Sequence, residues 1–192
     1  MWLLHRYVAA LKSHPYSANS CSALVVCSAG DALAQAYDRR DSSVERTAKL
    51  ACWGAGWMGP AGVVWYGLLE RLKGGVALKV AVNQAVFAPT TNALFYFYNE
   101  AWQASPTRPL KERYYERMSR EFLPTMLSSV AYWVPTQAFN LSAVPLHFRP
   151  LFLNTAFARS SGPPTCPSVG TGATTMRLPR SRVFSSGRTR RR

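Results

Sequence analysis

The sequence lacks the short motifs that mark many enzymes and cofactor-binding proteins. It contains no G-x-x-x-x-G-K-[ST] phosphate-binding loop and no G-x-S-x-G nucleophile turn. The three histidines lie far apart, and the four cysteines do not have the spacing of a metal site. We therefore expect a protein that is not an enzyme, with no catalytic residues, no metal and no cofactor.

Acidic residues are also scarce, and the last 34 of the 192 residues contain none. Ser, Thr, Gly, Pro and Arg make up 27 of those 34 positions, and eight of them are Arg. Such a segment buries too little apolar surface to offset the entropy lost on ordering. We predict a helical domain over residues 1–158 and a disordered basic tail over 159–192. An arginine-rich tail attracts any polyanion, so we expect no specific nucleic-acid partner.

Three long segments have no charged residue, and these dominate the interpretation. The segment 50–69 is twenty residues long, which gives a helix of roughly 30 Å, the thickness of the hydrocarbon core of a bilayer. The segments 80–99 and 122–148 repeat the pattern, and 13–37 is a weaker candidate. We predict an all-α, polytopic membrane protein with about four transmembrane helices, preceded by a short amphipathic helix over residues 2–14.

Each of the three strong segments has a proline near its middle, at Pro60, Pro89 and Pro135. A proline removes one backbone N–H and frees a carbonyl where bulk water is absent. Two interpretations stay open. The helices break around a water-filled cavity, as in transporters, or they kink and neighbouring helices satisfy the freed groups.

Polar side chains accompany these prolines, and uncharged amides are the most prominent of them. They are Asn83, Gln84, Asn92, Gln137 and Asn140. Amides are costly in hydrocarbon unless they are paired, so we expect them to face the interior, where they line a polar path or join one helix to another. Asp31 is the single acid within a predicted span, and either a functional role or an interfacial ion pair with Arg39 and Arg40 fits it.

Several shorter features complete the pattern. Ala51, Ala55 and Gly59 form a small-x3-small ridge that favours close helix packing. The charged run within 100–121 is interpreted as an exposed helical connector. Positive charge does not decide the orientation, because six basic residues fall on one side of a four-span arrangement and nine on the other when the tail is left out.

An ordered set of short motifs runs through most of the chain. They are Gly30-Asp31-x3-Gln35, Arg46-x2-Lys49, Gly59-Pro60, Trp65-Tyr66-x2-Leu69, Lys79-x3-Asn83-Gln84-x2-Phe87-Ala88-Pro89, Trp133-x-Pro135-x-Gln137-x2-Asn140 and Val144-Pro145-x3-Arg149. This set resembles the Mpv-seventeen and twenty-two-kilodalton peroxisomal membrane protein family, which includes the Sym-one type. The likeness extends from about Tyr7 to Asn154.

The resemblance implies about four spanning helices in the mitochondrial inner membrane or the peroxisomal membrane. It also implies a relatively nonselective channel for small solutes in some members, with links to mitochondrial homeostasis and stress. Asn83 stands where the family commonly has Asp. The apolar stretch that the family has after the Val-Pro motif gives way here to the basic tail, so we expect the last helix to be truncated.

We therefore hypothesise a protein of an organelle membrane that forms or lines a small-solute channel. The acid-free, basic start favours the mitochondrial inner membrane, with the peroxisomal membrane as the alternative. The expected partners are the lipid bilayer, small solutes and a second copy of the chain. The candidate lining or helix-break residues are Asp31, Pro60, Asn83, Gln84, Pro89, Pro135, Gln137 and Asn140. The alternative is a non-conducting scaffold in which the same amides only hold helices together.

Overall fold

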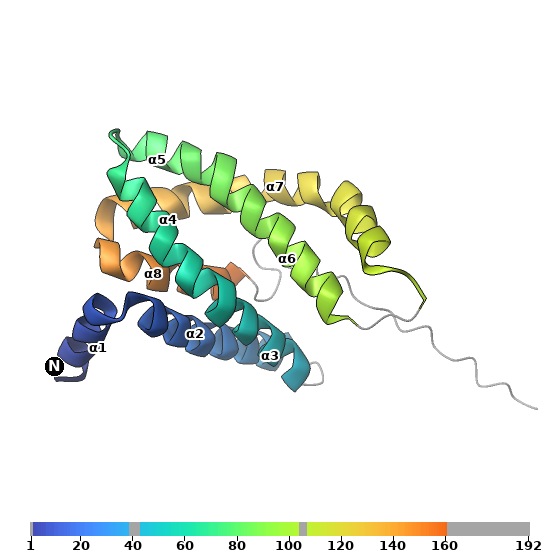
Figure 1. Cartoon of the computed structure of the whole chain (residues 1–192), viewed down its shortest axis with the longest axis horizontal. Coiled ribbons are helices and arrows are strands. Elements are labelled where there is room, and N and C mark those ends of the chain that lie inside the picture. Colours follow the sequence, from blue (N-terminus) through green and yellow to red (C-terminus); the bar gives the residue numbers. More distant parts are fainter. Residues whose placement is uncertain (1, 39–42, 104–106, 161–192) are drawn as a thin grey trace, which may run out of the picture.

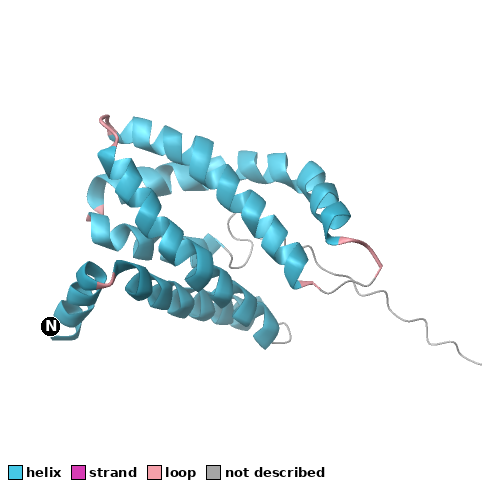
Figure 2. Cartoon of the chain, in the orientation of Figure 1, coloured by secondary structure: helices cyan, strands magenta, loops and turns pink. Residues whose placement is uncertain are grey.

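The chain forms helices throughout the part that the structure describes. A computed structural model describes residues 2–38, 43–103 and 107–160 (Figure 1). Every element in these ranges is helical, and no strand occurs in them (Figure 2). The predicted all-α class is therefore confirmed. Taken one at a time, the helices of these ranges do not reach the combination of length and apolar character needed to cross a membrane.

The N-terminal part contains two helices, α1 (Trp2–Ser13) and α2 (Pro15–Asp38). Pro15 opens α2, where the N–H that proline lacks would have no helical partner in any case. Leu11 of α1 is buried while Trp2 and Lys12 are exposed, so α1 is the amphipathic helix that the sequence predicts.

Two long helices follow, and each contains one π-turn. Their parts are, in chain order, α3 (Val44–Trp53), η1 (Gly54–Met58), α4 (Gly59–Arg71), α5 (Val76–Val82), η2 (Asn83–Phe87) and α6 (Ala88–Trp102). No residue separates a π-turn from the helix on either side of it, so the chain is helical without interruption over 44–71 and again over 76–102.

The C-terminal described part contains α7 (Leu110–Ala143), the short 3-10 turn η3 (Leu146–Phe148) and α8 (Arg149–Ser160). The predicted third span reaches residue 148, but α7 ends five residues earlier. The apolar stretch after the Val-Pro motif, which we expected to be a truncated last helix, forms the helix α8. The predicted tail from residue 161 onward lies outside the described residues.

The helices pack around one apolar core. α2 lies along α3, η1, α4 and α8, whereas α5 and α6 pack against α7 (Figure 1). The buried apolar residues at the centre are Leu50, Trp53, Met58, Tyr66, Leu69, Val80, Phe87, Phe95, Leu141 and Leu153.

All three mid-span prolines lie within continuous helix rather than at breaks. Pro60 and Pro89 each follow a π-turn, whose wider ring runs from the Gly59 N–H to the Gly54 carbonyl and from the Ala88 N–H to the Asn83 carbonyl. In an α-helix the proline ring collides with the carbonyl four residues earlier, and the wider π-turn relieves that crowding. Pro135 lies inside α7 with no interruption of the helix.

The π-turn η1 also sets which residues meet α2. Because its hydrogen bond joins residues five apart, Gly54 and Gly59 face the same neighbour. A Cβ on Gly54 would lie 2.7 Å from Cys27 Sγ, and one on Gly59 would lie 2.8 Å from the backbone of Ser20. Among the glycines, the close approach to α2 therefore involves Gly54 and Gly59, and Gly59 belongs to the predicted ridge.

Each end of the bundle contains a cluster of ion pairs. At one end Glu70 of α4 accepts a 2.7 Å hydrogen bond from Arg149 Nη1 and lies 3.4 Å from Lys79 Nζ. At the other end the carboxylate of Glu100 binds Arg113 at 3.0 Å and Arg117 at 2.9 Å. The charged run within 100–121 was predicted to be an exposed connector. This is wrong for Arg113 and Arg117, which are largely buried against α6, whereas Arg108 and Arg120 are exposed.

We predict that Gly59→Ala destabilises the bundle by about 1–3 kcal/mol, because the added methyl collides with the backbone of α2. A helix backbone cannot move aside as the end of a flexible side chain can. Gly56→Ala is the matched control, since it lies in the same π-turn with no atom within 4 Å of its Cβ position. Thermal unfolding of the purified chain in detergent measures both. Equal midpoints for the two variants would contradict the close contact.

We also predict that acid weakens the Glu70 cluster. The hydrogen bond from Arg149 lowers the pKa of Glu70 by more than the partial burial of the carboxyl raises it, and the charge of Arg149 and the contact with Lys79 lower it further. A lowered carboxyl pKa gives stability that is complete above the unfolded value of about 4.3 and is lost as the pH falls below it. Glu70→Gln should flatten the pH dependence of the unfolding midpoint below about pH 5, whereas Glu112→Gln, an exposed carboxylate on α7, should leave it intact.

Candidate functional site

The predicted amides meet at a seam between α4, η2 and α7, at mid-length of the bundle. Asn83 is the first residue of η2 and is 2% exposed. Its Oδ1 accepts a 2.8 Å hydrogen bond from the indole Nε1 of Trp65 on α4. The Trp65 ring also stacks on Phe87, with 5.1 Å between the ring centroids. One aromatic residue thus fixes the side chain of Asn83 and closes one side of the seam.

A second cluster joins α4 to α7 through the hydroxyl of Tyr66. This hydroxyl donates to Gln137 Oε1 at 3.1 Å and accepts from Asn140 Nδ2 at 2.8 Å. All three side chains are buried. We call Tyr66, Gln137 and Asn140 the tyrosine–amide cluster. Its three members hydrogen-bond one another and leave the buried Asn140 Oδ1 without a partner in the described chain, so its direct effect is to hold the two helices together.

Gln84 differs from the other amides of the seam. Its Nε2 and Oε1 are both buried, and neither has a hydrogen-bond partner in the described part of the chain. A buried amide normally has partners, and an unpaired one costs about 1–3 kcal/mol. The side chain is therefore suited to hold water or a polar solute.

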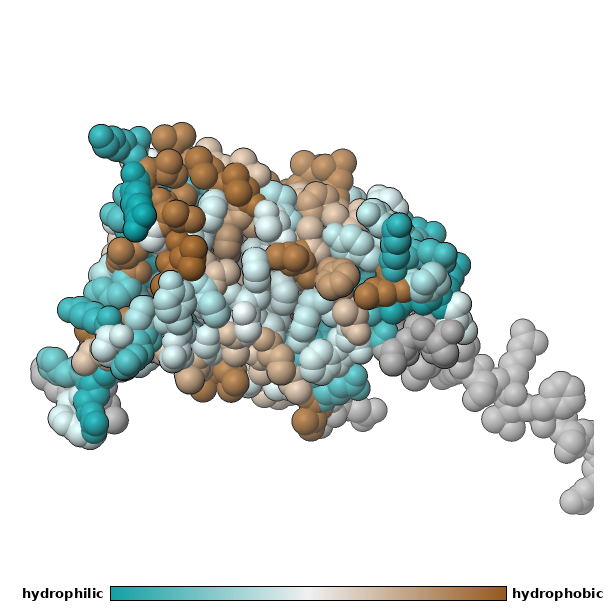
Figure 3. Space-filling model, viewed as in Figure 1, coloured by the Kyte–Doolittle hydropathy of each residue, from teal (hydrophilic) through white to brown (hydrophobic). Residues whose placement is uncertain are grey.

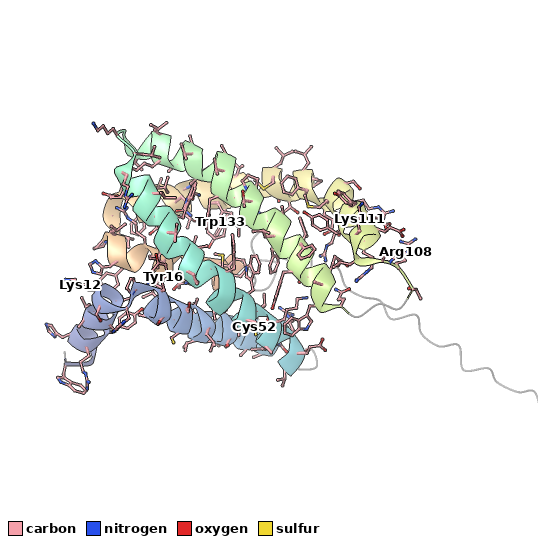
Figure 4. All side chains as sticks on the ribbon, in the orientation of Figure 1. Lys12, Tyr16, Cys52, Arg108, Lys111 and Trp133 are labelled. Carbon is pink, nitrogen blue, oxygen red and sulfur yellow. The ribbon has the colours of Figure 1, made fainter. Side chains whose placement is uncertain are left out.

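Gln84 faces a cavity of about 60 Å³ in the middle of the bundle. The cavity is lined by polar, aromatic and aliphatic residues, and none of its lining residues is charged. Trp133, labelled in Figure 4, is one of the aromatic residues. A cavity of this size accommodates a few water molecules. The polar lining residues are Asn83, Gln84, Thr91, Asn92 and Gln137.

The structure thus brings three predicted residues to one cavity, Asn83, Gln84 and Gln137, with Asn140 beside them in the tyrosine–amide cluster. The prolines are not part of its lining. Pro60 lines a separate outer groove between α4 and η2, and Pro135 is exposed. The interpretation of prolines surrounding a water-filled cavity is therefore not supported by their positions.

Asp31 lies away from the seam, between α2 and α3. Its carboxylate is 2.8 Å from Arg46 Nε and accepts a 2.7 Å hydrogen bond from Thr47, and it also contacts the Gln35 amide. The ion pair of Asp31 is thus made with Arg46. The expected partners Arg39 and Arg40 lie outside the described residues. This cluster explains Asp31 and Gln35 of the first motif and Arg46 of the second as a contact between two helices.

Several residues of these clusters were not recognised from the sequence as internal partners. The sequence places Trp65 and Tyr66 in a motif without indicating a role, and in the structure they bind the seam amides. Glu70 and Arg149 are also structural, since Arg149 donates to Glu70 and to the carbonyls of Leu141 and Val144 at the end of α7. The Trp-Tyr and Val-Pro-x3-Arg motifs contained the only sequence signals for these roles.

Ligand sites of other kinds find no support here. Among residues 2–38, 43–103 and 107–160, no three His, Cys, Asp or Glu side chains gather closely enough to bind a metal ion. Gly54, Gly56 and Gly59 have the G-x-G-x-x-G spacing of a dinucleotide-binding loop, but such a loop joins a strand to a helix. Here the glycines lie within a helix, and two of them pack on α2.

The fold and the seam define a class, an all-helical bundle whose central polar groups are amides and hydroxyls rather than charges. The model of the Mpv17 / PMP22 family matches residues 110–157, which cover α7 and most of α8. Protein sym1 of Aspergillus oryzae is 30% identical over 158 residues, which are 77% of this chain and 87% of that protein. The chain belongs to the Mpv17 / PMP22 family, and the resemblance seen in its sequence is confirmed.

Two further relatives carry names that refer to membranes. The mitochondrial inner membrane protein Mpv17 of Caenorhabditis elegans is 27% identical over 72% of this chain and 78% of its own length. Peroxisomal membrane protein 2 of Bos taurus is 24% identical over 79% of this chain and 82% of its own. These relatives confirm the predicted localisation, the mitochondrial inner membrane with the peroxisomal membrane as alternative. No solved structure matches the chain.

We predict that Tyr66→Phe lowers the free energy of unfolding by about 1–3 kcal/mol. The substitution removes the hydroxyl that joins Gln137 and Asn140, so both buried amides lose a hydrogen-bond partner. Tyr16→Phe is the control, since Tyr16 is 54% exposed on α2. Urea unfolding of both variants in the same detergent compares them. A loss of the same size in Tyr16→Phe would exclude a specific role for the cluster.

Proposed function

We propose that the chain is a polytopic protein of the mitochondrial inner membrane, with the peroxisomal membrane as the alternative location. The crossing segments are 15–37, 50–69, 80–99 and 122–143. The surface of the bundle supports this, because large apolar side chains are exposed on several helices, among them Leu33 at 72%, Leu127 at 67% and Leu123 at 63%. Exposed apolar area on this scale favours contact with lipid or protein.

The distribution of polarity supports the same proposal. In Figure 3 hydrophilic residues gather toward the two ends of the visible face, and apolar residues lie between them over α4, α5 and α6. Since each π-turn continues its helix, 44–71 and 76–102 are each about 40 Å long at 1.5 Å per residue, more than the roughly 30 Å of a hydrocarbon core.

Within this membrane protein we propose that the seam is the path of small solutes, ions included, in a relatively nonselective and non-enzymatic channel. Gln84 is the single observation that carries this proposal. Its amide is buried at mid-length, faces a cavity without charges and has no protein partner in the described chain. An amide in that position hydrogen-bonds whatever occupies the cavity. Small solutes, the bilayer and a second copy of the chain are the proposed partners.

The second candidate function is that of a non-conducting scaffold. The tyrosine–amide cluster favours it, because Gln137 and Asn140 bind Tyr66 and each other and so join α4 to α7 without any solute. The two candidates therefore assign different amides to different roles. Gln84 is the amide that distinguishes them.

We predict that Gln84→Leu lowers the solute conductance several-fold and raises the unfolding midpoint. Leucine removes the group that binds solute and also removes a buried amide that has no partner. Conductance of the purified chain in planar bilayers, with flotation to check insertion, measures the first effect, and thermal unfolding the second.

Ala85→Leu is the control, because residue 85 lies in the same π-turn on the exposed side. It should alter neither quantity. Unchanged conductance in Gln84→Leu at equal protein density would contradict the channel lining. Inserted wild-type protein that never conducts would favour the scaffold.

A further inference from the structure

The two ends of the bundle differ in their charge balance. We call the end formed by α1, the turn between α4 and α5, and the corner between α7 and α8 the basic end. It contains six basic residues and one carboxylate, Glu70. The basic residues are Arg6, Lys12, Arg71, Lys73, Lys79 and Arg149.

The opposite end is balanced. We call it the paired end, formed by the described residues of 31–49 and 100–121, which contain seven basic and seven acidic residues. The arginines of this end bind carboxylates across or along the helices, as Arg113 and Arg117 do with Glu100 and Arg108 does with Glu116. Figure 4 shows Lys12 at one end of the bundle and Arg108 and Lys111 at the other.

At the basic end the single carboxylate is already occupied. Glu70 is bound by Arg149 and Lys79, so the exposed cations Lys12, Arg71 and Lys73 have no carboxylate partner in the described part of the chain. Unpaired surface cations create a positive potential that attracts anions, and nothing acidic within this end neutralises it.

The shape of this end favours a membrane surface over a soluble anion. α1 is an amphipathic helix with Leu11 buried and with Trp2 and Lys12 exposed. The guanidinium of Arg6 lies over the Trp2 ring, 4.7 Å from its centroid. Tryptophan and basic residues on one short helix are typical of the headgroup region of a bilayer.

We infer that the basic end is a docking surface for anionic phospholipid headgroups, with the exposed cations Lys12, Arg71 and Lys73 as its main contacts to phosphate. The inference rests on the proposed embedding in a membrane. It adds that the leaflet at this end is bound through its negative charge, while the leaflet at the paired end is not. Each Lys or Arg near an anionic surface increases binding about fivefold at low salt.

The test uses the full chain and a charge-removing variant, Lys12→Gln/Arg71→Gln/Lys73→Gln. The matched control is Arg108→Gln/Lys111→Gln/Arg120→Gln, which removes three exposed cations from the paired end. The binding of phosphatidylglycerol and of phosphatidylcholine is titrated in neutral detergent micelles by the shift of the unfolding midpoint, at 50 and 500 mM NaCl.

We expect the wild type and the control to bind phosphatidylglycerol more tightly than phosphatidylcholine at 50 mM NaCl. The basic-end variant should lose on the order of tenfold or more of that preference. The preference should shrink at 500 mM NaCl, because exposed charges are screened. Equal binding of the two lipids by the wild type would overturn the inference, and so would an equal loss in the control variant.

Two additional measurements separate the alternatives. A DNA oligonucleotide that stabilises the chain as much as phosphatidylglycerol does, without lipid, would assign the surface to polyanions in general and overturn the inference. Flotation with phosphatidylcholine vesicles tests the embedding itself. Failure to float would reject the membrane proposal and this inference together, whereas flotation without any preference for phosphatidylglycerol would reject this inference alone.

Discussion

The close contact of α2 with the π-turn η1 is the constraint on which the rest of the bundle depends. A hydrogen bond between residues five apart places Gly54 and Gly59 against the same helix, and there is no space there for a Cβ. With α4 fixed along α2, the next glycine of α4, Gly62, faces Pro150 at the start of α8. Gly30 of α2 meets Ala158 near the other end of α8, so the same contact positions three helices. The side of α4 that carries Trp65 and Tyr66 remains available for η2 and α7.

That arrangement separates the seam amides into two physical kinds. Asn83, Gln137 and Asn140 are bound by aromatic side chains of α4. The Trp65 N–H donates to Asn83, and the Tyr66 hydroxyl donates to Gln137 and accepts from Asn140. A polar group that is paired inside an apolar bundle strengthens it. Gln84 follows Asn83 immediately but points toward the cavity, where no protein group reaches it. Two consecutive residues of η2 thus have different roles. The paired amide of Asn83 stabilises the bundle, and the amide of Gln84 is available to a ligand.

Much of the fold could be predicted from the sequence, and the parts that could not have clear physical reasons. The charge-free segments and their flanks identify the helices, and Pro15 marks the start of α2, because burial and proline geometry act locally. The π-turns were not predictable, since no sequence period signals one extra residue in a turn, and the predicted small-residue ridge therefore did not include Gly54. The amides were expected at one interior site. Whether each would find a partner depends on which face of α4 meets α7, which is a tertiary property.

Ion pairs attach α7 to its neighbours near both of its ends. Arg113 and Arg117 attach the start of α7 to Glu100 of α6, and Arg149 attaches its end to Glu70 of α4. Between these two clusters α7 contains two prolines, Pro124 and Pro135, each of which removes a backbone hydrogen bond within the helix. A helix fixed at both ends and weakened between them bends more easily than it slides. Bending of the middle of α7 would widen the proposed path beside Gln84, and the tyrosine–amide cluster, which joins α7 to α4, would oppose that bending.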